Sequence, residues 1–117
     1  MTLNEYQEAA MTTCLPTSEN FSYMGLNLVG EVGEFSSKIA KAIRKGKVVI
    51  LNNQLDTTGM SADEIIDLKK EAGDILWQLS GLCTVMGWSL EDVAQQNLDK
   101  LAERKQRNVI DGSGDNR

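Results

Sequence analysis

The sequence of 117 residues contains no histidine. This absence excludes imidazole as a metal ligand, and it excludes the Ser–His and Cys–His pairs that activate many nucleophilic enzymes. It also excludes the Glu-x-x-His pattern that holds two irons in some helical bundles. A catalytic centre in this chain must therefore rely on other side chains.

Cysteine is scarce as well. Cys14 and Cys83 are the only two, and each lies in apolar sequence. Their spacing indicates neither a Cys-x-x-Cys metal site nor a disulfide framework. Any metal must then be held by oxygen. Two unpaired thiols are typical of a reducing compartment, so we expect the protein in the cytoplasm.

Long apolar runs and an excess of positive charge are also missing. No stretch approaches the roughly 20 apolar residues of a membrane-spanning helix, and the first residues lack the basic and apolar segments of a signal peptide. The net charge of −5 argues against nucleic acid or an anionic membrane as the main partner. A small anionic substrate is compatible with this charge when a bound cation offsets the carboxylates.

The only proline, Pro16, separates two predicted helices. The first covers about residues 4–14, and the second covers about residues 22–45 and ends at Gly46. The segment from Lys47 to Met60 contains a β-branched run followed by Asn and Gly residues. This composition predicts a loop that carries a short extended piece.

Two further helices are predicted in the second half of the chain. Ser61 and Glu64 form a capping box, which starts a third helix that extends to about Gly87. Ser89 begins a fourth helix in the same manner. Apolar residues recur in the third helix at steps of three and four, as expected for a core element: Ile65, Leu68, Ala72, Ile75, Leu79, Leu82 and Met86. We predict one all-α domain over residues 1–117 with a four-helix core bundle.

Two pairs of carboxylates have the spacing of a single helix face. Glu31 and Glu34 are three residues apart in the second predicted helix, and Glu71 and Asp74 are three apart in the third. If these helices pack side by side, the four carboxylates converge. Mg²⁺ prefers carboxylate oxygens, and it commonly takes its other ligands from water and substrate phosphates. The pattern therefore predicts a magnesium site suited to phosphate chemistry.

Each pair taken alone is more often solvated helix surface than a site. The neighbouring residues favour the site. Gly30, Gly33 and Gly73 lie inside helices, where each costs about 1 kcal/mol relative to alanine, which suggests close helix approach or space for a ligand. Asp74 is followed by apolar Ile75-Leu76-Trp77, where an uncompensated charge is expensive.

Lysines continue the same face of the second helix. Lys38, Lys41 and Lys45 follow Glu34 at steps of four, three and four. Ammonium groups placed beyond a metal site suit a triphosphate. The alternative is that Lys38 pairs with Glu34 on its own helix and that the other lysines are solvated.

Three segments, in order, resemble the MazG-like all-α nucleoside triphosphate pyrophosphohydrolases. They are Gly30-Glu31-Val32-Gly33-Glu34 with Lys41 and Arg44, then Glu71-Ala72-Gly73-Asp74-Ile75-Leu76-Trp77, then Asn97-Leu98-Asp99-Lys100-Leu101 with Arg104. The resemblance spans about residues 3–107. It implies Mg²⁺-dependent hydrolysis of nucleoside or deoxynucleoside triphosphates to monophosphate and pyrophosphate, as in cleansing of the nucleotide pool. It also implies a homodimer or homotetramer with sites between subunits, and Mn²⁺ as a substitute metal.

The resemblance assigns roles to individual residues. The metal ligands would be Glu31, Glu34, Glu71 and Asp74. Of these, Glu34 and Glu71 are expected to be catalytic, with Glu34 favoured as the group that orients or deprotonates the attacking water. Substrate-binding roles are expected for basic and amide side chains, namely Lys38, Lys41, Arg44, Asn97, Lys100, Arg104 and Arg117.

Several of these roles have a plainer alternative. Asn97 would bind base or sugar and Lys100 a phosphate, but both also fit an exposed helix surface. The tail, residues 108–117, either is flexible or closes over the site through Arg117 and its Gly-Ser-Gly backbone. Trp77 and Trp88 are candidates for base contact, although packing is the more common role.

The resemblance also places Tyr6 and Gln7 near the pocket. Two functional alternatives stay open. One is a related enzyme acting on phosphoribosyl-ATP, and the other is a non-catalytic helical module that binds nucleotide or a protein. A P-loop enzyme is excluded because the sequence has no Gly-x-x-x-x-Gly-Lys-Ser/Thr loop.

Overall fold

A computed structural model describes residues 1–117 as four α-helices with a small hairpin between the second and third. The elements are α1 (Leu3–Met11), a short 3-10 helix η1 (Pro16–Ser18), α2 (Phe21–Arg44), β1 (Val49–Leu51), β2 (Gln54–Asp56), α3 (Ala62–Val85) and α4 (Leu90–Gln106). The predicted all-α class and the extended piece between helices are confirmed. None of the helices combines the length and apolar character needed to cross a bilayer.

The helix ends follow the local signals in the sequence. The Ser61 hydroxyl accepts a hydrogen bond from the Glu64 N–H, and the Glu64 carboxylate accepts one from the Ser61 N–H, both at 3.1 Å. This capping box starts α3 as predicted. Gly46 and Gly87 follow α2 and α3 with φ of 72° and 74°, a left-handed conformation that stops a helix and favours glycine.

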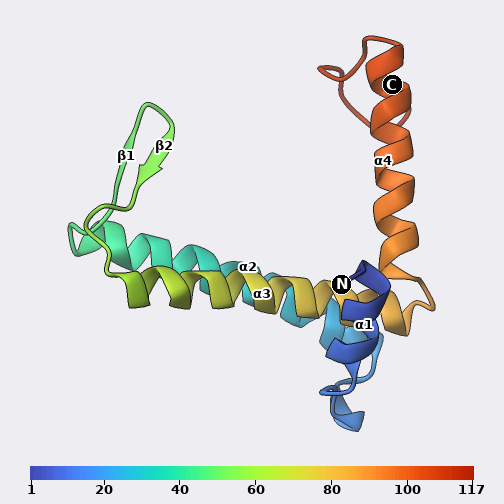
Figure 1. The fold of residues 1–117 in the computed structure, drawn as a ribbon, viewed down its shortest axis with the longest axis horizontal. Helices are drawn as coiled ribbons and strands as arrows, with labels where there is room; N and C mark the ends of the chain where they lie inside the picture. The colour runs from blue at the N-terminus through green and yellow to red at the C-terminus, as the bar shows by residue number, and fades with distance from the viewer.

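α2 and α3 pack side by side along most of their length (Figure 1). Met24 of α2 is fully buried where it meets Gly81 of α3. A Cβ added at Gly81 would lie only 2.3 Å from the Met24 sulfur, so glycine permits this close approach. Cys83, two residues after Gly81, is also buried, at 2% exposed. This junction forms the centre of a small core.

α1 attaches to α3 through hydrogen bonds. The Trp77 indole N–H donates to the Ala10 carbonyl at 3.1 Å and to the Thr13 hydroxyl at 2.9 Å. The amide of Gln7 donates to Thr84 and to the Trp88 carbonyl, both at 3.0 Å. Trp77 and Gln7 therefore hold the N-terminal segment against α3. This structural role accounts for the Trp77 indole N–H without contact to a base.

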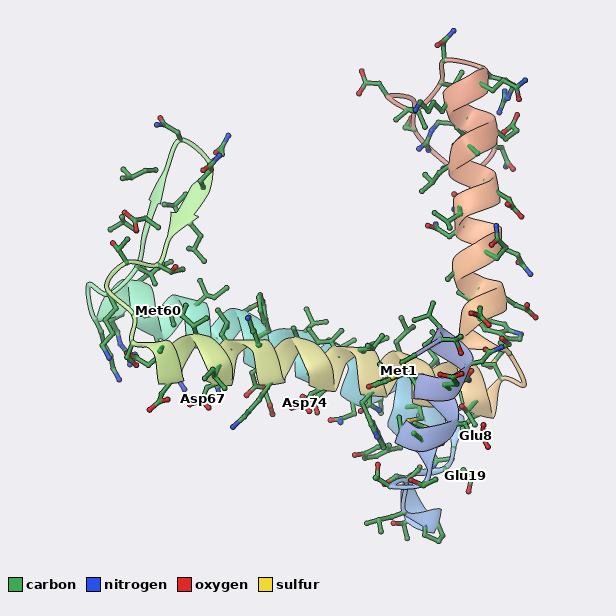
Figure 2. All side chains as sticks on the ribbon, in the orientation of Figure 1. Met1, Glu8, Glu19, Met60, Asp67 and Asp74 are labelled. Carbon is green, nitrogen blue, oxygen red and sulfur yellow. The ribbon has the colours of Figure 1, made fainter.

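α4 leaves the end of α3 and stands away from the α2–α3 pair (Figure 1). The radius of gyration of 17.5 Å exceeds the about 13 Å typical of a globular domain of this length. Only 10 of the 117 residues are buried, and side chains of α4 and the hairpin extend into solvent (Figure 2). One chain by itself thus leaves much apolar surface uncovered.

The hairpin is a local structure. Its antiparallel register pairs Val49 with Asp56 and Leu51 with Gln54. The connecting residues Asn52 and Asn53 both have positive φ, 53° and 61°. Two consecutive left-handed residues form the tight turn whose twist matches that of paired strands, and asparagine tolerates this conformation better than most residues.

An ion pair joins the base of the hairpin to α3. The Glu64 carboxylate accepts a hydrogen bond from Lys47 Nζ at 2.7 Å, and this contact, with the Ser61 N–H, lowers the pKa of Glu64 from 4.5 to about 2. A lowered pKa stabilises the folded state above pH 4.5, and that stabilisation is lost as the pH falls from 4.5 to about 2.

We therefore expect Glu64→Gln to be less stable than wild type at pH 7 and equally stable near pH 2. Urea unfolding at the two pH values measures this difference. Glu8→Gln, an exposed glutamate of α1, is the matched control and should follow wild type throughout. A destabilisation of Glu64→Gln that is the same at both pH values would contradict the expectation.

Candidate functional site

Three carboxylates meet between α2 and α3. One oxygen each of Glu31, Glu34 and Glu71 lies within 4.8 Å of the others. The spacing of three residues places Glu31 and Glu34 near one face of α2, and the packing of α3 against α2 brings Glu71 to them. The convergence predicted from the sequence is therefore present for these three residues.

Asp74 lies at the margin of this cluster. It is exposed, and Figure 2 shows it on the same side of α3 as Asp67. Although apolar residues 75–77 follow Asp74 in the sequence, α3 turns its carboxylate toward solvent, so the charge is not buried among them. Its negative charge still acts on the cluster, since it contributes to raising the pKa of Glu31.

Glu31 and Glu71 share a hydrogen-bonding pattern. In each carboxylate the Oε1 atom has a partner: the Asn27 amide donates to Glu31 at 3.2 Å, and Lys38 Nζ donates to Glu71 at 2.9 Å. In each the Oε2 atom is buried and has no partner. A buried oxygen without a hydrogen bond is costly. Two such atoms in one acidic cluster fit the ligand set of a hard cation.

The cluster carries an excess of negative charge, because Lys38 pairs with only one of its carboxylates, Glu71. Burial raises the pKa of Glu31, and the charges of Glu34, Asp74 and Glu71 raise it further, while the Asn27 hydrogen bond opposes them. Like charges held close together disfavour ionisation. A bound divalent cation would reverse this effect and stabilise the ionised carboxylates.

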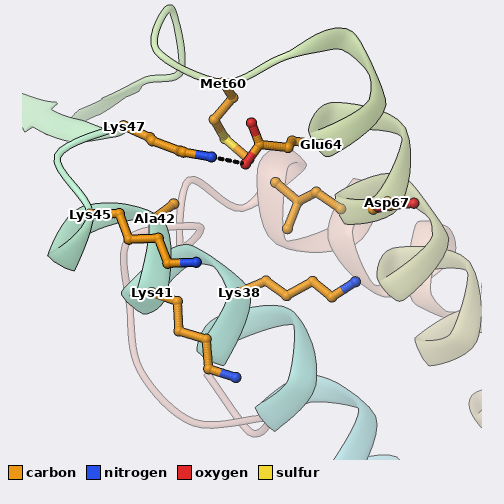
Figure 3. Close-up of a pocket in the computed structure, with 9 residues that line it drawn as sticks. Lys38, Lys41, Ala42, Lys45, Lys47, Met60, Glu64 and Asp67 are labelled. Atoms are coloured by element: carbon orange, nitrogen blue, oxygen red, sulfur yellow. Dashed lines mark hydrogen bonds and ion pairs between the residues drawn. The ribbon is translucent and has the colours of Figure 1, made fainter.

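A basic pocket adjoins the carboxylates. Figure 3 shows four lysines around a cavity of about 210 Å³: Lys38 and Lys41 of α2, Lys45 directly after it, and Lys47 of the following loop. Lys38 bonds Glu71 across the helices, and not Glu34 along its own helix, so it belongs to both the pocket and the cluster. Arg44 is exposed and does not line this pocket.

The residues of α4 do not join this site within one chain. Asn97 and Lys100 line a separate shallow hollow on α4 with Val93 and Gln96. Because α4 stands away from the α2–α3 pair (Figure 1), these side chains remain distant from the carboxylates of the same chain. Their expected role in substrate binding is therefore not seen within one chain.

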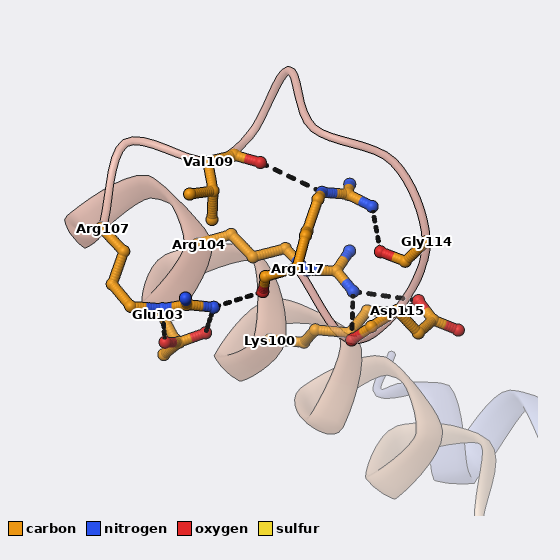
Figure 4. Close-up of polar contacts among 8 residues, drawn as sticks. All are labelled: Lys100, Glu103, Arg104, Arg107, Val109, Gly114, Asp115 and Arg117. Atoms are coloured by element: carbon orange, nitrogen blue, oxygen red, sulfur yellow. Dashed lines mark hydrogen bonds and ion pairs between the residues drawn. The ribbon is translucent and has the colours of Figure 1, made fainter.

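Arg104 is held by the C-terminal tail (Figure 4). Its side chain is 5% exposed, and the guanidinium donates to the Asp115 carboxylate at 2.9 Å and to the Asp115 carbonyl at 3.1 Å. Lys100 also pairs with Asp115, at 3.3 Å. The two α4 cations suggested for substrate binding, Lys100 and Arg104, are thus already paired with a carboxylate.

Arg117 stays within the tail. Its guanidinium donates to the carbonyls of Val109, at 3.0 Å, and Gly114. A Cβ at Gly112 would lie 2.6 Å from the Arg117 side chain, so glycine makes room for this closed loop. The tail, residues 108–117, therefore folds back on the end of α4 and not over the carboxylates of its own chain.

We expect Asp115→Ala to loosen this tail, because the Arg104 guanidinium would lose its ionic partner. Hydrogen–deuterium exchange should become faster in residues 108–117 and stay unchanged in α2 and α3. Asp111→Ala, an exposed aspartate of the same tail, is the control and should exchange as wild type does. Unchanged protection of the tail in Asp115→Ala would show that this pair does not hold it.

Two polar residues beside the cluster were missed by the sequence analysis. Asn27 lies four residues before Glu31, and Gln78 is 1% exposed in the core. An amide within the apolar run around Trp77 was a signal, because a buried polar group requires a partner. The spacing of four residues between Asn27 and Glu31 was a second signal.

Comparisons with known proteins agree with this architecture. The profile of the MazG nucleotide pyrophosphohydrolase domain matches residues 19–109, which include all of α2, α3 and α4. The gene 37 protein of Mycobacterium phage L5 is 37% identical over 124 aligned positions, and the alignment covers the whole of both chains. No solved structure matches. The chain therefore belongs to the MazG family of nucleotide pyrophosphohydrolases.

Proposed function

We propose that this protein hydrolyses nucleoside or deoxynucleoside triphosphates to monophosphates and pyrophosphate with Mg²⁺, and so cleanses the nucleotide pool. The observation that carries the proposal is the pair of buried, unpartnered Oε2 atoms of Glu31 and Glu71. Membership of the family supports pyrophosphohydrolase chemistry in general. The adjoining lysine pocket supports a substrate with several phosphates.

The residues divide the work of the reaction. Mg²⁺, or Mn²⁺ in its place, would be held by Glu31, Glu34 and Glu71 with Asp74 beside them, and it would supply positive charge to the phosphate oxygens. Glu34 is exposed, and it would orient or deprotonate the attacking water.

The lysine pocket complements this arrangement. Lys41 and Lys45 would bind the phosphates that lie beyond the metal, as ammonium groups stabilise charge that is transferred during cleavage. Lys38 would keep the Glu71 carboxylate in place through the 2.9 Å contact while it faces the same substrate.

We also propose that the active form is a homodimer or homotetramer. Leu26 and Val29, one helical turn apart on α2, are 76% and 73% exposed, and Gly33, the next turn along, has no neighbour within 4 Å of an added Cβ. Such an uncovered apolar and small face suits a second helix. Sedimentation of wild type and Val29→Glu tests this, with dissociation expected for the variant.

An oligomer also gives α4 a role in the reaction. α4 of one copy would lie over the α2–α3 pair of another and bring Asn97 and Lys100 to the nucleotide. We place the activity in the cytoplasm, where the free thiols Cys14 and Cys83 persist.

The direct test is a panel of ribo- and deoxyribonucleoside triphosphates with Mg²⁺, scored for monophosphate and pyrophosphate. Release of both products from one or more of them, and its loss when Mg²⁺ is chelated, is the expected result. Activity confined to phosphoribosyl-ATP would instead support the related enzyme. No product from any triphosphate would support a module that binds without turnover.

A further inference from the structure

A chain of hydrogen bonds leads from the helical core to the carboxylate cluster. The Gln78 amide nitrogen donates to the Met24 carbonyl at 3.3 Å, and the Asn27 amide nitrogen donates to the Gln78 oxygen at 2.9 Å. The same Asn27 nitrogen donates to Glu31 Oε1 at 3.2 Å. Glu31 is thus connected through two amides to a backbone carbonyl of its own helix.

The donor and acceptor chemistry leaves one arrangement for both amides. An ionised carboxylate only accepts hydrogen bonds, so Asn27 must present its NH₂ group to Glu31. The second hydrogen of that NH₂ group is donated to Gln78, which must accept it through its side-chain oxygen. The NH₂ group of Gln78 then faces the Met24 carbonyl, which also only accepts. Each hydrogen bond in the series thus pairs one donor with one acceptor, with the same amide orientations throughout.

The surroundings make this arrangement rigid. Gln78 is 1% exposed and Met24 is fully buried, so neither has water as an alternative partner. Gly30 leaves space for the Asn27 side chain, because a Cβ at Gly30 would lie 3.2 Å from the Asn27 oxygen. The buried inner part of the network, from Gln78 to the Met24 carbonyl, is therefore held in one orientation, and it positions the partly buried Asn27.

The last hydrogen bond of the series, from Asn27 to Glu31, determines which Glu31 oxygen is free. Because Oε1 accepts from Asn27, the carboxylate cannot rotate without losing that bond, and the unpartnered atom is Oε2. Groups that hydrogen-bond a metal-ligating side chain commonly set its orientation and its affinity for the metal. Neither amide forms a hydrogen bond with Glu34 or Glu71.

We propose that Asn27 and Gln78 are positioning residues that fix the Glu31 carboxylate for metal binding, with Gln78 acting through Asn27. This inference rests on the proposed metal site. It predicts that either amide can be replaced by an apolar side chain of similar size without loss of the fold but with loss of metal affinity. It also predicts that the effects of the two replacements on metal affinity are not additive, since both interrupt the same series of hydrogen bonds.

Binding of Mn²⁺ alone, without nucleotide, tests the inference on the full-length protein. Electron paramagnetic resonance of free Mn²⁺ gives the Kd for wild type, Asn27→Leu, Gln78→Met and the double variant. We expect each single variant to bind about 10-fold more weakly, and the double variant to bind no more weakly than Asn27→Leu. Circular dichroism reports whether each variant is folded, and Asn27, being only partly buried, is the safer site for substitution.

Two further variants separate the possible failures. Ser80→Ala removes another fully buried polar side chain of α3, which bonds only its own helix at Leu76, and should bind Mn²⁺ as wild type does. Glu31→Gln should lose the site. If Asn27→Leu and Gln78→Met bind like wild type while Glu31→Gln does not, or if their effects add, the positioning role is wrong and the metal site stands. If wild type and Glu31→Gln are equally unable to bind, the proposed function fails and takes the inference with it.

Discussion

Replacing Glu71 with glutamine is expected to lower kcat/KM for pyrophosphate release by at least about 100-fold, since it removes a direct metal ligand, and outer groups alone are commonly worth 10- to 100-fold. The amide keeps the size of the side chain but carries no charge. It also leaves Lys38, which lies 2.9 Å from Glu71, without its anionic partner. Steady-state kinetics over a range of Mg²⁺ concentrations would measure the loss.

The control for this variant is Glu19→Gln, an exposed glutamate before α2, which should retain wild-type kinetics. Thermal unfolding should show that Glu71→Gln remains folded, because removing one of several like charges relieves repulsion in the cluster. If Glu71→Gln releases pyrophosphate at the wild-type rate, Glu71 is neither a metal ligand nor a catalytic group.

Replacing Met24 with alanine is expected to destabilise the protein by about 2–5 kcal/mol, the range for buried Met-to-Ala changes that leave a cavity. Met24 is fully buried and fills the space that Gly81 leaves open. Its removal therefore leaves a void at the junction of α2 and α3. Urea unfolding followed by far-ultraviolet circular dichroism measures the change in the free energy of unfolding.

Met86→Ala is the matched control, because Met86 at the end of α3 is 42% exposed and surface changes usually stay within about 0.5 kcal/mol. Since the carboxylates come from both α2 and α3, Met24→Ala should also weaken Mn²⁺ binding. Equal stability of the Met24 and Met86 variants would show that the junction does not hold the two helices together.

The helix boundaries could be predicted because their causes are local. Ser61 and Glu64 satisfy each other's backbone within four residues, and Gly46 supplies a left-handed stop directly after α2. The loop from Lys47 to Met60 was harder. Its strand pairing depends on a turn of two asparagines in a conformation that asparagine tolerates but does not require.

The carboxylate site was predictable only in part. Helical spacing and side-by-side packing were enough to bring Glu31, Glu34 and Glu71 together. The position of Asp74 depends on how α3 is rotated, because three residues turn a helix by about 300° and leave the two side chains about 60° apart. With Glu71 directed at α2, Asp74 comes to lie at the margin.

The orientation of α4 and the path of the tail were not accessible from the sequence. α4 has few neighbours in its own chain, so nothing local determines its direction. The tail depends on Asp115 meeting Arg104 across 11 residues, and spacing in an irregular segment gives no information about such a contact. Long-range pairs of this kind follow from the whole fold and not from a motif.

The buried thiol of Cys83 provides an internal reporter of folding. Burial raises the pKa of Cys83, and the thiolate is the form that reacts with alkylating reagents. This thiol can therefore be modified only when α3 separates from the core. The rate of modification then reports how often the native state opens. Cys14, which is only half-buried, would be modified first and mark the start of the measurement. Mass spectrometry of a single labelling series would then compare every variant described above without the introduction of a probe.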